Sequence, residues 1–304
     1  MKTLAKAVAM LGGLILGGLS GGAQAVTINA TLTEADSKAL AAPFDAVVSL
    51  DLGGALCTGT LVSTIHILTA RHCILATPAA TTVRFDDKTN GQTFSRGVSD
   101  IANMVGQNYE DGTDISILTM VQPVTSIAPM RLAAGALVGE GARLVGYGVS
   151  AVADAIDGTP DGERWAADNT IDNIGQSAVF PQSMIGSLLE ADFDNPTGTS
   201  NSLSSVGSSP TMLFYEGAPA VGDSGGPLLV NRGGEWQIAG VLTGGTETYG
   251  AYGDVSWWTS VFSPAARGFI ETNSTAVFAP VPLPASLALL LVGLGGLVAL
   301  RWRV

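Results

Sequence analysis

Charged residues are scarce in this chain of 304 residues, and basic ones are the scarcest. Asp, Glu, Lys and Arg make up 13% of the sequence against 46% hydrophobic residues. This excludes a disordered chain, because such chains are rich in charge and poor in apolar side chains. The 14 basic residues stand against 26 acidic ones, for a formal net charge of −12. A nucleic-acid binder needs a basic face, so we expect no nucleic-acid partner.

Cysteine and histidine are also rare, with two residues of each. Two cysteines are too few for a small scaffold held by several disulfides or for a zinc site of four thiolates, and we expect no metal and no cofactor. Patterns of long amphipathic helices are absent, whereas glycine is abundant at 39 residues, which favours turns and strands. The length allows one large domain or two small ones.

Residues 1–25 have the pattern of an export signal. Lys2 and Lys6 supply a positive start, an apolar run follows, and Ala23-Gln24-Ala25 is a small-x-small cleavage site. The alternative is a buried first helix, but four glycines within the apolar run would weaken it. The mature chain is therefore expected to begin at Val26, outside the cytoplasm, where a disulfide can persist.

The other end of the chain carries a second special segment. A Pro-containing motif, Val281–Ala285, precedes an apolar run that ends at Leu300, and Arg301 and Arg303 follow. As a helix, the run spans roughly 24 Å against about 30 Å of hydrocarbon, so it is short for a permanent anchor. The segment resembles the bacterial VPLPA/PEP-type sorting signals, which an exosortase-type membrane enzyme recognises. An ordinary tail anchor is the alternative.

Between these ends the sequence is a series of short apolar or alternating runs, broken by Gly, Pro, Asp and Asn as in an all-β barrel or sandwich. The runs are Ala46–Leu50, Gly59–Val62, Ile65–Leu68, Val83–Phe85, Ile115–Met120, Arg143–Tyr147, Pro227–Val230 and Gln237–Leu242. The polar stretches 154–173 and 192–211 are predicted to be surface loops. Ser263-Pro264 predicts the start of a short helix that runs to about Glu271.

Three short strings carry groups that can do chemistry. Gly222-Asp223-Ser224-Gly225-Gly226-Pro227 places a serine between glycines, which permit a tight turn and close access of a substrate. In the string Leu68–Cys73, His72 lies at the end of an apolar run and directly before Cys73. In the string Gly112–Leu118, Asp114 lies directly before another apolar run. A serine hydroxyl becomes a nucleophile when a base removes its proton, so His72 and Ser224 form a candidate pair.

These strings resemble the trypsin/chymotrypsin-like serine peptidases, in the motif order His, Asp, Ser. GDSGGP matches at all six positions, and the family's TAAHC is matched except at Arg71. Gly146-Tyr147-Gly148 and the strand Gly240–Gly245 also resemble family elements, and the resemblance covers about residues 41–272. It implies a disulfide between Cys57 and Cys73. It also implies an all-β fold of two packed antiparallel six-stranded barrels with a short C-terminal helix.

The resemblance also implies roles for the site residues. Ser224 is expected to attack the scissile carbonyl, His72 to act as the base, and Asp114 to orient His72. Backbone N–H groups of Gly222 and Ser224 are expected to form the oxyanion hole. Taken singly, each residue also has an ordinary structural explanation, and His66, the other histidine, is interpreted as structural.

The specificity pocket departs from the trypsin pattern. Ala218 stands where trypsin-like enzymes have the Asp that pairs with substrate Lys or Arg, which predicts a small or apolar preference. With Ala218, the residues Thr243, Gly245 and Gly250 are expected to bind the substrate. Glu247 could supply a charge there, although a solvated loop residue is the simpler interpretation.

No R-I-V-G-G activation site is visible in the sequence. A new amino terminus at Val26, released by signal cleavage, could instead pair with Asp223, the family's partner for such a terminus. Asp223 could also be satisfied by internal hydrogen bonds. Five loop carboxylates could hold Ca²⁺, or could simply be solvated. They are Asp154, Asp157, Asp161, Asp192 and Asp194.

The sequence thus predicts an exported serine endopeptidase that acts on protein or peptide substrates as a monomer at the cell surface or in the medium, transiently anchored by its tail. The alternative is a catalytically silent, protease-like binding or matrix protein. The expected organisation has four parts: a signal peptide (1–25), an N-terminal segment (26–40), a peptidase domain (41–275, with barrels at about 41–135 and 136–272) and a sorting signal (276–304).

Overall fold

The structure is a computed structural model that describes residues 26–106, 111–153, 161–175, 177–180, 183, 186–246 and 250–280. The predicted signal peptide and nearly all of the predicted sorting signal lie outside these residues, so both stay predictions. Within the described part of the chain, no helix is long and apolar enough to cross a membrane. The apolar run that ends at Leu300 is not among the residues searched.

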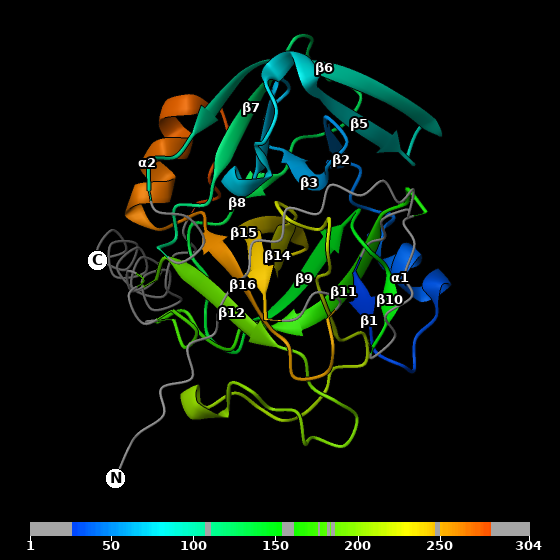
Figure 1. The fold of residues 1–304 in the computed structure, drawn as a ribbon, viewed down its shortest axis with the longest axis vertical. Coiled ribbons are helices and arrows are strands. Elements are labelled where there is room, and N and C mark those ends of the chain that lie inside the picture. Colours follow the sequence, from blue (N-terminus) through cyan, green and yellow to red (C-terminus); the bar gives the residue numbers. More distant parts are fainter. Residues whose placement is uncertain are drawn as a thin grey trace, which may run out of the picture.

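The first half of the chain forms a closed barrel of six antiparallel strands in the order β2-β3-β4-β7-β6-β5 (Figure 1). Closure leaves no exposed strand edge. Leu50, Phe85 and Ile117 are fully buried inside it or nearly so. The strands are β2 (Val47–Leu52), β3 (Leu56–Leu61), β4 (His66–Thr69), β5 (Thr81–Asp87), β6 (Gln92–Asn103) and β7 (Ser116–Met120).

The second half forms a sheet in the order β11-β9-β14-β15-β16-β12, with β8 added beside β15. Its ladder does not close, but an isolated bridge between Asn173 and Glu190 joins the ends of the path. The predicted fold class is confirmed, with a half-barrel in place of the second closed barrel. The strands are β8 (Arg131–Leu132), β9 (Gly141–Gly146), β11 (Trp165–Thr170), β12 (Leu188–Asp192), β14 (Pro227–Arg232), β15 (Glu235–Gly245) and β16 (Val255–Ser260).

The N-terminal segment belongs structurally to the second half. Strand β1 (Thr27–Ile28) lies between β10 (Ala151–Val152) and β13 (Gly217–Ala218). Helix α1 (Glu34–Ala41), which was not predicted, begins with a capping box and packs beside β11. Short 3₁₀ helices occur at Arg71–Cys73, Pro78–Ala80 and Ser204–Val206.

The prediction of a surface loop over 154–173 is wrong for its second part, because β11 runs through it and pairs with β9. The stretch is polar, yet several of its polar groups form hydrogen bonds inside the fold. The amide of Asn169 donates to the backbone oxygens of Asp192 and Gly217. The buried guanidinium of Arg164, just before the strand, lies 2.6 Å from Asp45. Hydrogen bonds of this kind allow polar residues to be buried.

The predicted C-terminal helix is confirmed as α2 (Pro264–Asn273), two residues longer than expected. The hydroxyl of Ser263 accepts from the N–H of Ala266, as an N-cap does. Ala266 and Ile270 are fully buried and join the same apolar cluster as the first barrel. Figure 1 shows α2 beside that barrel. This helix, which follows the second half in the sequence, therefore packs against the first half.

The predicted disulfide between Cys57 and Cys73 is present and joins β3 to the segment that carries His72. In the double variant Cys57→Ala/Cys73→Ala we expect the free energy of unfolding to fall by roughly 3 kcal/mol, because the unfolded chain gains loop entropy. Urea unfolding of the variant and of reduced wild-type protein measures this. The two should agree, and an unchanged midpoint in both would contradict a stabilising bond.

Candidate active site

His72 and Asp114 are joined by two hydrogen bonds. Asp114, just before β7, is almost fully buried, whereas the His72 side chain is 21% exposed. Oδ2 of Asp114 lies 2.7 Å from Nδ1 of His72, and Oδ1 accepts from the backbone N–H of His72 at 2.8 Å. The carboxylate therefore fixes both the backbone and the ring of His72. A ring bonded through Nδ1 to a carboxylate turns Nε2 away from it, in the geometry of a general base.

The turn that carries Ser224 packs directly against the His72 segment. The carbonyl oxygen of Ser224 accepts from the N–H of Thr58 at 2.9 Å and lies 3.5 Å from Sγ of Cys73. Gly225, at φ +83°, has no room for a side chain, because a Cβ there would lie 2.8 Å from the backbone nitrogen of Ala70. The structure thus brings together the sequence motifs of Ser224 and His72.

Asp223 is buried beneath this turn and accepts three backbone hydrogen bonds. The donors are Val26 at 2.9 Å, Ala220 at 2.8 Å and Gly148 at 2.8 Å. Burial raises the pKa of the Asp223 carboxyl to about 6, although the three donors act in the opposite direction. Both partners suggested by the sequence, Val26 and internal N–H groups, therefore contact this carboxylate.

A cavity of about 220 Å³ lies beside Ser224. It is smaller than a pocket for a drug-sized ligand and suits a single side chain. Of the predicted substrate-binding residues, Gly245 lines it. The full lining is Pro219, Ala220, Val221, Ser224, Leu242, Gly244, Gly245 and Thr246.

The other predicted substrate-binding residues are not part of that lining. Ala218 is buried, pairs with Thr27, and lies against the backbone of Gly250. The Thr243 hydroxyl lies 2.9 Å from that of Thr259. Their roles in substrate binding stay predictions, as does the oxyanion hole at Gly222 and Ser224. Glu247 lies outside the described residues.

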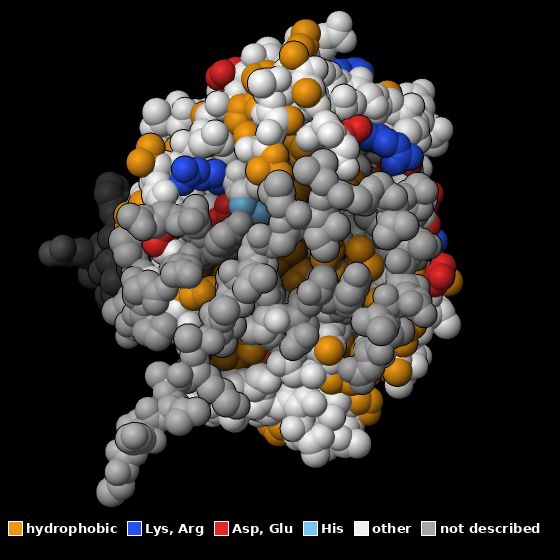
Figure 2. All heavy atoms as spheres, in the orientation of Figure 1, with side chains coloured by type: hydrophobic (Ala, Val, Ile, Leu, Met, Phe, Trp, Pro, Cys, Tyr) orange, Lys and Arg blue, Asp and Glu red, His pale blue; other side chains and the backbone are white. Residues whose placement is uncertain are grey.

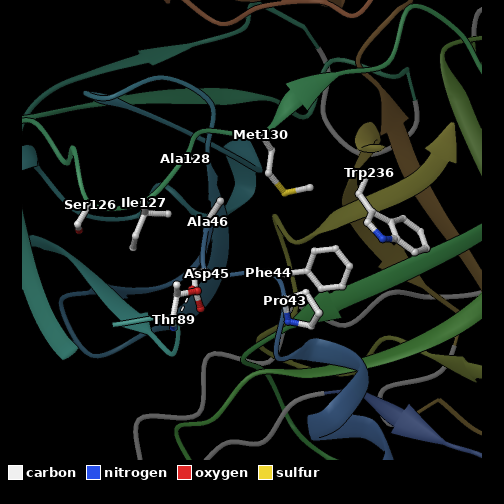
Figure 3. A pocket seen from close by; sticks show the side chains of 10 residues that line it. All are labelled: Pro43, Phe44, Asp45, Ala46, Thr89, Ser126, Ile127, Ala128, Met130 and Trp236. Atoms are coloured by element: carbon white, nitrogen blue, oxygen red, sulfur yellow. Dashed lines mark hydrogen bonds between the residues drawn. The ribbon is translucent and has the colours of Figure 1, made fainter. Parts of the chain in front are cut away.

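A larger cavity of about 350 Å³ lies elsewhere and shares no lining residue with the first. Figure 3 shows Phe44, Met130 and Trp236 around it, with the Phe44 and Trp236 rings edge to face at 5.5 Å. Its one titratable side chain, Asp45, is bound by Arg164 and Thr89. This cavity is apolar and carries no candidate acid–base pair.

The second histidine, His66, is separate from these groups. Its Nδ1 lies 2.7 Å from the Ser63 hydroxyl, and burial lowers its pKa. On the face drawn in Figure 2, the Lys and Arg side chains of the described residues are scattered rather than gathered into a basic patch.

Four buried carboxyl groups gather near β12 and β13: Asp172, Asp192, Asp194 and Glu216. Burial raises the pKa of Asp172 to about 8, with repulsion from Asp192 as the next cause. Burial also raises the pKa values of Asp194 and Glu216, each to about 7. Within the described part of the chain, no group of three or more His, Cys, Asp or Glu side chains could hold a metal ion.

The comparisons with known proteins agree with this geometry. The family model for trypsin matches residues 34–161, which include His72 and Asp114. The venom plasminogen activator Haly-PA of Gloydius brevicauda is 27% identical over 226 residues, which cover 71% of this chain and 77% of that protein. These matches support a likeness of this chain to the trypsin-like serine peptidases. The chain is a serine endopeptidase, as its sequence predicted.

A solved structure extends the likeness in fold to the second half of the peptidase. Neuropsin, a serine protease expressed in the limbic system of mouse brain, superposes with a TM-score of 0.55 at 18% identity. The match covers 74% of this chain and 93% of that one. It therefore includes residues after 161, where the match of the trypsin family model ends.

Sequence reasoning missed Thr58, which links the two halves of the site. Its hydroxyl donates to the carbonyl of Gly222 at 3.1 Å and accepts from the N–H of Tyr147 at 3.0 Å. A threonine inside an apolar strand carries no local signal of such a role. The position of Thr58 directly after Cys57 is the one feature of the sequence that could have indicated this role.

The raised pKa values predict that alkali destabilises the fold. The folded state keeps protons on Asp172, Asp194 and Glu216 that the unfolded chain loses near pH 4, so the free energy of unfolding falls as pH rises from about 4 and levels off above about 8. One group contributes at most about 1.4 kcal/mol per pH unit. Urea unfolding between pH 6.5 and 9 measures the slope. At the lower edge of this window His66 acts in the opposite direction, because burial lowers its pKa in the folded state.

The variant Asp172→Asn tests whether ionisation of Asp172 causes this loss of stability. Its amide cannot ionise, so its stability should fall less between pH 7 and 9 than that of the wild type. Asp100→Asn, on the exposed part of β6, is the matched control and should keep the wild-type slope. Equal slopes for all three proteins would contradict the assignment.

Proposed function

We propose that this peptidase hydrolyses peptide bonds with Ser224 as nucleophile, His72 as base and Asp114 as the group that orients His72. The observation that carries the proposal is the double hydrogen bond from Asp114 to the backbone and ring of His72, on a segment packed against the Ser224 turn. That arrangement is what a serine hydroxyl needs to lose its proton.

In the first half of the reaction, Oγ of Ser224 attacks the scissile carbonyl carbon as Nε2 of His72 takes its proton. The carbonyl oxygen becomes an anion, which the N–H groups of Gly222 and Ser224 are proposed to stabilise. His72 then protonates the leaving amine, the C–N bond breaks, and an ester to Ser224 remains. Asp114 stabilises the ring while it is positively charged.

In the second half, water takes the place of the amine. His72 removes a proton from the water, whose oxygen attacks the ester, and returns that proton to Oγ of Ser224. The carboxylic acid product leaves and the enzyme is regenerated without any cofactor. The cavity beside Ser224 would hold the substrate side chain next to the bond that is cut.

We also propose that the peptidase is exported, with residues 1–25 removed and the segment from Val281 recognised by an exosortase-type enzyme. The sequence patterns support this, as does the disulfide, which persists outside the cytoplasm. Protein or peptide substrates follow from the family. The matched venom protein is a plasminogen activator, so exported protein substrates are the first class to test.

The variants Ser224→Ala and His72→Ala should each lower turnover of a peptide substrate by on the order of 10⁴–10⁶-fold, because either loss disables the nucleophile. A fluorophosphonate probe reports the same group by covalent labelling, which should vanish in Ser224→Ala. Thermal unfolding checks that the variants fold. If folded, mature wild-type protein stays unlabelled, the catalytically silent binding or matrix protein is the better description.

The mature amino terminus is proposed to be Val26. This residue is fully buried and is the one non-glycine of the described chain with positive φ, at +43°. A β-branched residue is strained there while a peptide bond precedes it, and cleavage before Val26 removes that constraint. The freed amino group would carry a positive charge 2.9 Å from a carboxylate oxygen of Asp223 and neutralise that buried group.

Amino-terminal sequencing of the active enzyme should therefore begin at Val26. A version that starts with one extra alanine before Val26 should lose at least about 10-fold in kcat/KM, because the buried carboxylate loses its cation and the turn loses its active conformation. A version with one extra alanine after Pro280 is the control. An active enzyme that starts several residues away would contradict the proposal.

A further inference from the structure

Backbone hydrogen bonds orient the two N–H groups that are proposed to form the oxyanion hole. In a trans peptide the C=O points away from the N–H of the next residue, so a bond that fixes one group also fixes the other. The oxygen of Val221 accepts from the N–H of Val149 at 2.6 Å. The N–H of Gly222, the next residue, therefore points away from Val149.

The N–H of Ser224 is oriented in the same way. The oxygen of Asp223 accepts from the N–H of Gly226 at 2.7 Å, on the opposite side of the peptide from the N–H of Ser224. Within the part of the chain that the structure describes, the N–H groups of Gly222 and Ser224 have no protein acceptor. Both can therefore donate to an oxygen of a substrate.

A side chain holds the peptide that lies between these two donors, which joins Gly222 to Asp223. The hydroxyl of Thr58 donates to the oxygen of Gly222 at 3.1 Å and accepts from the N–H of Tyr147 at 3.0 Å. A backbone N–H can only donate, so it uses a lone pair of the hydroxyl and leaves the single hydroxyl proton for Gly222. The directions of both hydrogen bonds are therefore fixed.

Thr58 is itself firmly placed. It is fully buried on β3, its N–H donates to the oxygen of Ser224 at 2.9 Å, and its own oxygen accepts from the Thr69 hydroxyl at 2.8 Å. The side chain of a β-branched residue has few rotamers, so this fixed backbone leaves the hydroxyl little freedom. Thr58 thus binds the turn at two points, Ser224 through its backbone and Gly222 through its side chain.

Gly222 needs such a bond because its own conformation is weakly restrained. Its φ is +94°, and a Cβ there would lie 2.7 Å from Cα of Gly148, so only glycine fits. A glycine backbone rotates more freely than that of any other residue. Rotation about Gly222 changes the angle between its N–H and that of Ser224, and a hydroxyl bonded to its oxygen limits this rotation.

We propose that Thr58 is a positioning residue, whose hydroxyl holds the turn so that the N–H groups of Gly222 and Ser224 point at one oxygen. The proposal rests on the proposed function, since the two N–H groups act only if Ser224 attacks a carbonyl. Because Thr58 is fully buried, it cannot touch the substrate and acts through the turn. The oxyanion forms in the transition state, so loss of the hydroxyl should lower kcat and leave KM nearly unchanged.

Kinetics on a fluorogenic peptide test this role with three variants. Thr58→Val keeps the shape and replaces the hydroxyl by a methyl, so kcat should fall at least about 10-fold while KM stays nearly the same. Thr58→Ser keeps the hydroxyl and should keep nearly the wild-type kcat. Thr81→Val is the matched control and should also keep it, since Thr81 is likewise buried in the first barrel and its hydroxyl donates to the oxygen of Thr77 at 3.0 Å.

Hydrogen exchange followed by mass spectrometry tests the hold on the turn without any chemistry. The N–H groups of Asp223, Gly225 and Gly226 donate hydrogen bonds within or beside this turn. Their exchange in Thr58→Val should be at least about 10-fold faster than in the wild type, because a looser turn opens more often. Thr58→Ser and Thr81→Val should exchange as the wild type does. If Thr58→Val does not fold, Thr58→Ala, which forces no methyl against the carbonyl, takes its place with the same expected results.

The two failures are distinguishable. A wild type that labels with fluorophosphonate, together with a Thr58→Val variant that keeps the wild-type kcat, would overturn the role of Thr58 alone. The same holds if KM rises as kcat falls, or if Thr58→Ser loses as much as Thr58→Val, because Thr58 would then only support the fold. A folded wild type that neither labels nor cleaves would remove the proposed catalysis. In that case exchange decides whether the hydroxyl holds the turn, and equal exchange in Thr58→Val and wild type would contradict it.

Discussion

The site depends on the close approach of one backbone turn to the first barrel. Ser224 lies in the second half of the chain and His72 in the first, so the turn around Ser224 must contact β3 and β4 directly. Gly225 makes this possible, because a Cβ there would overlap the Thr69 hydroxyl at 2.1 Å and the Thr58 carbonyl at 2.3 Å. Any side chain at this position would separate Ser224 from His72, the proposed nucleophile and base.

Two buried carboxylates hold the parts around that contact in place, each in a different way. Asp114 binds the backbone and the ring of His72 together, so this ring has a fixed orientation within its own barrel. Asp223 accepts hydrogen bonds from the N–H groups of Val26, Gly148 and Ala220, so the turn that carries Ser224 is tied to the residue before β1 and to the segment after β9. Both carboxylates are satisfied by donors, which is how a buried charge is tolerated.

The local motifs were readable in the sequence, whereas long-range relations were not. Serine and histidine between characteristic neighbours, and apolar runs of strand length, give signals within a few residues. The strand β11 was missed because Asn169 is satisfied by atoms more than 20 residues away. Likewise, the open second ladder depends on how the ends of β11 and β12 meet, for which the chain has no local pattern.

The pocket illustrates the same limit most clearly. A sequence motif assigns specificity to one position, Ala218, but in an antiparallel sheet the same cavity can be reached from a neighbouring strand. Here Gly245 lines the cavity and lies against Asp254, and the pairing of β15 with β16 sets that contact. The position that a motif names therefore does not by itself define the cavity wall, because the wall also depends on which strands the sheet brings together.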